Sequence, residues 1–243
     1  MKMLTFQKRC AKEILRDPLN LCFGIGFPVI LLILLNAINT NIPNDLFAIE
    51  YLAPGIAIFG LSFITLFSAT LISKDRESSF LERLYTTPLT PLDFILGYMI
   101  PLLPIGLSQG VITYLLAIFL GLPIKINILF AILLMTPAVI LYIMLGLFFG
   151  SILNVKQVGG ICGALLTNLS AWLSGIWFDI SLVGGAFERI ARLLPFYHAV
   201  ELQRAVINNN PSAILPSLFT VLLYAVIIGS FAVLLFLRQM KKQ

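Results

Sequence analysis

The residues that could do acid–base or nucleophilic chemistry are few in this sequence. There is one histidine, His198, and there are three cysteines, Cys10, Cys22 and Cys162. The cysteines lack the C-x-x-C spacing of zinc and redox sites, and no H-E-x-x-H or G-x-S-x-G sequence occurs. We therefore expect no catalytic residues, no metal site and no cofactor on this chain, and we expect that it is not an enzyme.

Nucleotide-binding and ion-coupling chemistry are also missing. The sequence has no G-x-x-x-x-G-K-[ST] phosphate-binding loop. Its long apolar segments contain no Asp, Glu, Lys or Arg, whereas proton-driven carriers usually place ionisable groups inside the bilayer. Milder polar residues do occur there, among them Thr65, Ser68, Gln109 and Ser170. They could join helices through hydrogen bonds, or they could line a path for an amphiphilic substrate.

The segment 74–92 carries the clearest recognition pattern. It reads KDRESSFLERLYTTPLTPL, with Phe80, Leu81 and Leu84 at helical spacing and charged residues between them. A short mixed-charge helix of this kind can fit into a groove on a cytosolic partner. The alternative is a solvated connector whose charges only set the membrane topology.

The elements that position this segment are membrane helices. The chain is 59% hydrophobic and 11% charged, far from the balance of soluble domains. Six segments are long enough to cross a bilayer, which takes about 20 residues. They are 19–38, 51–73, 94–124, 126–155, 157–178 and 211–237. The sequence thus predicts an all-α integral membrane protein, with residues 1–243 forming a single transmembrane domain.

The distribution of basic residues predicts the orientation. If the N-terminus is cytoplasmic, the inner segments hold 12 Lys and Arg residues and the outer segments hold 4, so both termini should be cytoplasmic and the chain should be a multi-pass protein of the plasma membrane. The net charge is +5, and the basic residues lie between the apolar segments. We therefore expect contact with lipid headgroups and no nucleic acid partner.

Two further segments are predicted to be short helices. Residues 1–18 have apolar side chains on one half of a helical wheel and basic ones on the other, as in a helix lying in the membrane interface. Residues 180–207 form two apolar stretches interrupted by Pro195, which predicts a pair of helices entering the outer leaflet.

At this point the sequence resembles the permeases of type-2 ABC exporters. These show R-E-x-G-T-x-E-x-L-x-x-T-P after the second span, and this chain has Arg76, Glu77, Glu82, Leu84, Thr87 and Pro88 at the matching spacing, followed by Gly97. It departs at Ser78 and Ser79, where Gly-Thr is usual, and at Tyr98, where Lys is usual. A second similarity, to L-P-x…E-x-x-R, is carried by Leu194, Pro195, Phe196, Glu201 and Arg204.

The resemblance implies a partner set and a site. Two permease subunits, in the simplest case a homodimer, would form the path, and two ABC ATPase subunits would bind ATP and Mg below it. The residues expected to couple to the ATPase are Arg76, Glu77, Phe80, Leu81, Glu82, Arg83, Leu84, Thr87 and Pro88. The expected substrate is an amphiphilic drug, peptide or lipid. The alternative function is a transporter or channel that works without an ATPase.

Overall fold

A computed structural model describes residues 2–41, 48–78, 80, 81 and 90–241 of the chain. This described part is built of helices and contains no strand. In chain order they are α1 (Lys2–Leu15), α2 (Pro18–Asn39), α3 (Ile49–Glu77), α5 (Pro91–Phe119), α6 (Ile126–Leu134), α7 (Thr136–Ile152), α8 (Val155–Val158), the π-helix η1 (Gly159–Leu166), α9 (Thr167–Leu173), the 3₁₀ turn η2 (Ile180–Leu182), α10 (Gly185–Leu193), α11 (Pro195–Ile207) and α12 (Pro211–Lys241). The all-α prediction is confirmed.

Local sequence signals explain where several of these helices begin. The Asp17 side chain accepts a hydrogen bond from the Asn20 backbone N–H, and Pro18 occupies the first turn of α2. Thr90 and Asp93 form a capping box at the start of α5. Such caps satisfy backbone donors that have no partner within the helix.

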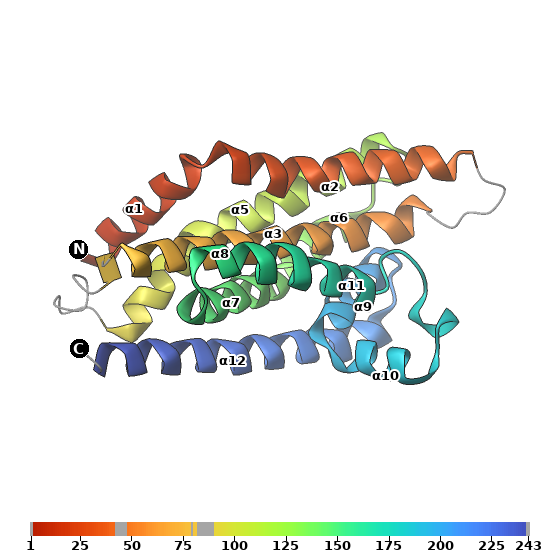
Figure 1. Cartoon of the computed structure of the whole chain (residues 1–243). Helices are drawn as coiled ribbons and strands as arrows, with labels where there is room; N and C mark the ends of the chain where they lie inside the picture. Colours follow the sequence, from red (N-terminus) through yellow and green to blue (C-terminus); the bar gives the residue numbers. More distant parts are fainter. Residues whose placement is uncertain (1, 42–47, 79, 82–89, 242–243) are drawn as a thin grey trace.

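Among the described residues, five helical segments are long and apolar enough to cross a membrane: Asn20–Asn39, Ile49–Glu77, Leu92–Phe119, Ile126–Ile152 and Pro211–Arg238. They correspond to five of the six predicted spans. The remaining one, predicted over 157–178, is a path of three short pieces, α8, η1 and α9, that ends at Leu173. In Figure 1, α1 begins and α12 ends at the same end of the bundle.

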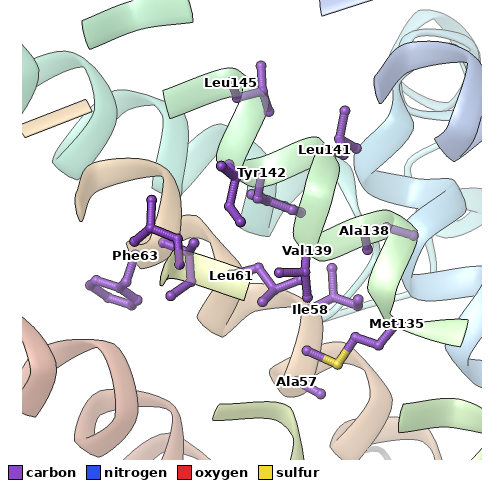
Figure 2. Packing of buried hydrophobic residues seen from close by; sticks show 14 of the residues in the cluster. Ala57, Ile58, Leu61, Phe63, Met135, Ala138, Val139, Leu141, Tyr142 and Leu145 are labelled. Atoms are coloured by element: carbon purple, nitrogen blue, oxygen red, sulfur yellow. The ribbon is translucent and has the colours of Figure 1, made fainter. Parts of the chain in front are cut away.

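The centre of the bundle is α3. In the most apolar stretch of α3, about 83% is buried inside the protein. The corresponding buried share is 17% in α2 and 22% in α12. Apolar side chains of α3, including Ile58 and Leu61, face Val139 and Tyr142 of α7 (Figure 2). The outer helices α2 and α12 are therefore left with apolar faces that suit lipid, whereas α3 packs against protein.

The α3–α7 contact is close because it uses small residues. Gly146 and Gly150, one turn apart on α7, lie directly on the backbone of α3 near Thr65 and Ala69. The hydroxyl of Thr65 donates to the carbonyl of Tyr142 at 2.7 Å, and Ser68 donates to the carbonyl of Ile143 at 3.2 Å. Glycines spaced four apart let helix backbones approach in this way.

Two segments differ in detail from the sequence expectation. The predicted connector 74–92 begins inside a helix, because α3 continues without a break to Glu77. The N-terminal helix is amphipathic as expected, but part of its apolar face is covered by protein: Phe6, Cys10 and Ile14 are buried, whereas Leu4 and Leu15 are exposed. Phe6 packs edge-on against Tyr98 of α5, with ring centroids 4.9 Å apart.

Candidate functional site

The end of α3 nearest α1 carries a buried carboxylate. Asp75 is 1% exposed. Both oxygens of its carboxylate accept hydrogen bonds from the guanidinium of Arg9 on α1, and the hydroxyl of Tyr98 on α5 donates to it at 2.7 Å. One carboxylate therefore joins three helices that are far apart in the sequence. Bidentate pairing with arginine is the strongest geometry available to such a group.

Arg9 has further neighbours. Its guanidinium lies 2.6 Å from a carboxylate oxygen of Glu13, one turn along the same helix, and 4.2 Å from the centre of the Phe80 ring. Burial disfavours the charged form, but the hydrogen bonds and charge of Asp75 outweigh it and raise the pKa of Arg9. The arginine stays charged, and it links α1 to the first residues of the connector.

Cys10 lies beside this group on the buried face of α1. Its side chain is 0% exposed, and burial raises the pKa of the thiol to about 12. A thiol that is both covered and protonated is a poor nucleophile. The free cysteine is therefore a packing residue.

The two motif residues at the end of α3 face a different neighbour. Arg76 donates hydrogen bonds to the backbone carbonyls of Ser151 and Leu153, the second at 2.5 Å. The carboxylate of Glu77 accepts a hydrogen bond from the backbone N–H of Val155 at 2.8 Å. These carbonyls and this N–H lie at the end of α7 and the start of α8, where helix groups lack partners. Arg76 and Glu77 thus satisfy the backbone of the α7–α8 turn.

The remaining predicted coupling residues are only partly described. Phe80 is half-buried under Arg9, and Leu81 is 1% exposed. Glu82, Arg83, Leu84, Thr87 and Pro88 lie outside the described residues, so the predicted coupling helix is not observed. The structure does describe the start of this connector, Asp75, Arg76 and Glu77, which we call its root. Asp75 holds the root on one side, and Arg76 and Glu77 hold it on the other.

The second predicted motif lies at the other end of the bundle. Pro195 and Phe196 begin α11 and are buried, and Glu201 is half-buried. Arg204 is 6% exposed; its Nη2 donates to the carbonyl of Gly175 at 2.9 Å.

Arg204 also contacts the first turn of α3. Its Nε donates to the carbonyl of Tyr51 at 3.3 Å, and its guanidinium carbon lies 3.3 Å from the centre of the Tyr51 ring. Gly175 has a φ of 72°, a conformation that glycine adopts without strain; in it the carbonyl of Gly175 meets Arg204. Arg204 therefore joins α11, α3 and the turn after α9. The structure does not bring the two predicted motifs together; it places them at opposite ends of α3.

Several polar residues inside the bundle join helices. Besides Thr65 and Ser68, the hydroxyl of Tyr142 on α7 and that of Ser170 on α9 share a hydrogen bond of 2.7 Å, and the Tyr114 hydroxyl donates to Gln203 at 2.9 Å. For Thr65, Ser68 and Ser170 the hydrogen-bonding alternative is the one observed. Gln109 differs, because its Oε1 is buried without a partner among the described residues.

The sequence reading missed Asp75, Arg9 and Tyr98 as site residues. A signal was present: Asp75 follows directly on an apolar span, and a carboxylate there needs a nearby cation. Tyr98 stood out as a departure from the exporter motif, and its hydroxyl bonds with Asp75. No sequence pattern paired Asp75 with Arg9, which lies 66 residues away in the chain.

A multi-pass helical membrane protein whose described charged residues cluster towards the ends of the long helices fits a membrane transport subunit. The chain matches the family of ABC-2 type transporters over residues 1–208, and it belongs to that family. It is therefore the permease subunit of an ABC transporter, a class that associates with an ABC ATPase. Searches of curated proteins and of solved structures gave no match.

Proposed function

We propose that this chain is the membrane half of an ATP-driven exporter of an amphiphilic drug, peptide or lipid. The observation that supports this most is the fixed root of the 74–92 connector. Asp75, Arg76 and Glu77 connect the end of α3 to α1, α5, α7 and α8. A push applied to the connector by a partner would therefore reach four helices at once, which is what a mechanically driven permease requires.

The partner would act by favouring one of two arrangements of the bundle. ATP binding closes an ATPase dimer and moves the connectors docked on it, and the helices follow. Such a switch works only if the ligand binds the two states with different affinity. In this scheme two copies of the chain, a homodimer in the simplest case, form the path, and two ATPase subunits hold ATP and Mg. This chain itself catalyses nothing and binds no cofactor.

The placement in the cell follows from the same scheme. The connector and both termini lie on the cytoplasmic side of the plasma membrane, where ATP is available. The basic residues Lys8, Lys12 and Arg16 at α1 are exposed, whereas Phe6, Cys10 and Ile14 are buried. The exposed basic face is therefore left for anionic headgroups or for the ATPase.

Reconstitution into sealed vesicles tests the energy source. The permease is incorporated with a candidate ABC ATPase chain, and the movement of a fluorescent phospholipid analogue and of a cationic amphiphilic dye is followed. We expect movement with ATP and none without it. Movement driven by an imposed ion gradient, with the permease as the sole protein, would contradict the proposal and favour an ATPase-independent transporter.

Partner docking is tested with Glu82→Arg. Reversing this charge in the connector should reduce co-purification of the ATPase, or separate hydrolysis from transport, because complementary charges at interfaces set affinity and register. The matched control is Glu50→Arg, which reverses an exposed charge in the first turn of α3, at the opposite end of the bundle. Wild-type co-purification and wild-type hydrolysis in Glu82→Arg would remove the connector from the ATPase contact.

A further inference from the structure

Asp75 is costly to bury, and the proposed transport path does not require it. A carboxylate taken out of water costs several kcal/mol of free energy unless its oxygens are paired. Here Arg9 supplies two hydrogen bonds and Tyr98 a third. Buried ion pairs can often be replaced by apolar residues of similar size without loss of stability. The pair therefore calls for a role other than holding the fold together.

Each member of this pair has a second partner that stays with it if α1 moves. Arg9 keeps Glu13, which lies on its own helix. Asp75 keeps the hydroxyl of Tyr98, which lies on α5. Separating α1 from α3 would thus leave neither charge without a hydrogen bond. Because each charge keeps a second partner, this contact can open and close. In an isolated buried pair, separation would leave both charges without a partner.

The same contact includes the start of the connector. The ring of Phe80 lies under the guanidinium of Arg9, and Leu81 is buried next to it in the sequence. Withdrawing Arg9 from Asp75 would therefore also remove the cation above Phe80. Arg9 is thus a contact that α1 shares with Asp75 and with the Phe80 ring at the start of the connector.

We propose that Asp75 is a positioning residue for ATP coupling: it holds α1 and the beginning of the connector as one unit, so that both move together when the ATPase acts. This inference rests on the proposed function. Packing of Phe6, Cys10 and Ile14 alone would hold α1 against α5. The charge of Asp75 adds a fixed register between α1 and the connector, which apolar contacts do not specify.

Cys10 reports directly on whether α1 is held in place. In a Cys22→Ser/Cys162→Ala background, Cys10 is the remaining native thiol, and its alkylation by N-ethylmaleimide is timed in membranes that contain the complex. We expect slow labelling in this background and at least ten-fold faster labelling in Asp75→Asn, which keeps the shape of the side chain but loses its charge. The matched control, Glu50→Gln, removes an exposed carboxylate at the other end of α3 and should label slowly.

Hydrolysis by the assembled complex tests the coupling role. In complexes with Asp75→Asn we expect kcat for ATP hydrolysis to equal that of the isolated ATPase. KM for ATP should be unchanged, because the nucleotide binds on the partner. Tyr98→Phe, which removes one hydrogen bond but keeps the ring against Phe6, should give a smaller effect in both assays. If gel filtration shows that Asp75→Asn does not fold, Tyr98→Phe provides the test instead.

The outcomes separate the two proposals. Labelling of Cys10 in Asp75→Asn and Tyr98→Phe at the background rate would overturn the positioning role. So would fast labelling together with unchanged kcat. Failure of the proposed function would instead be seen in the wild-type chain, as the absence of any bound ATPase; the coupling role then falls with it, and the labelling rates still decide whether Asp75 holds α1.

Discussion

The close approach of α7 to α3 makes a definite prediction for Gly150→Ala. A Cβ added at Gly150 would lie 2.6 Å from the carbonyl oxygen of Ala69 and 2.8 Å from its Cα. Non-bonded carbon atoms pack at about 3.5–4.0 Å, so α7 would have to move about 1 Å away from α3. The obstacle is backbone within a helix, and it cannot turn aside as the end of a flexible side chain could.

The expected loss follows from the cost of overpacking. Inserting a methyl group into a tightly packed contact costs about 1–3 kcal/mol of free energy of unfolding. Separation of the helices would also lengthen the hydrogen bonds from Thr65 and Ser68 to α7, each contributing about 1 kcal/mol. We expect a loss of about 2 kcal/mol, which for a chain of this size lowers Tm by about 4–8 °C.

The measurement is the thermal unfolding of purified protein in one detergent, followed by circular dichroism. Gly26→Ala on α2 is the matched control, because the nearest atom to its added Cβ is the Cys22 sulfur at an ordinary 3.8 Å. The control should unfold at the wild-type temperature or above it, since alanine is favoured over glycine inside a helix. Equal Tm values for Gly150→Ala and the wild type would refute the view that the glycines set the α3–α7 spacing.

Three other predictions address the ends of the bundle. Arg204→Met should lower the free energy of unfolding by about 1–3 kcal/mol, because the carbonyls of Gly175 and Tyr51 lose a charged donor; the same unfolding assay checks it, and an unchanged Tm would contradict the described contacts. Arg76→Gln should increase proteolysis at the α7–α8 turn, whose carbonyls lose a charged donor; a wild-type cleavage pattern would argue against this role. A single cysteine at Ser181 should react with an impermeant thiol reagent in whole cells, and one at Ser78 only after permeabilisation; the reverse pattern would invert the topology.

The helices could be predicted from composition alone because a bilayer demands long apolar segments. Five predicted spans correspond to long helices of the structure. The segment 157–178 was harder. It contains Gly159, Gly160 and Gly163, which weaken a helix, and it folds as a π-helix between two short α-helical pieces. A π-helix is defined by hydrogen bonds between backbone groups five residues apart. A hydropathy pattern does not reveal which backbone groups are bonded.

The candidate site could be predicted in part for a similar reason. Arg76 and Glu77 were recognised from the spacing of a motif, whereas their hydrogen bonds to the α7–α8 turn could not be, because those partners are about 75 residues away. Asp75 was passed over because a charge at the end of a span is usual in a membrane protein. Its pairing with Arg9 depends on how α1 folds back on α5, which sequence spacing does not reveal.

α3 runs between the two groups of contacts, with Arg204 at its first turn and Asp75, Arg76 and Glu77 at its last. Its 29 residues span about 43 Å. Along this length the glycines of α7 leave little room for bending or sliding. In mechanical terms α3 is a strut: a displacement at one end arrives at the other nearly undiminished. Compliance is then concentrated in the two end joints, and substitutions that separate ATP hydrolysis from transport should be sought there before the middle of the helix.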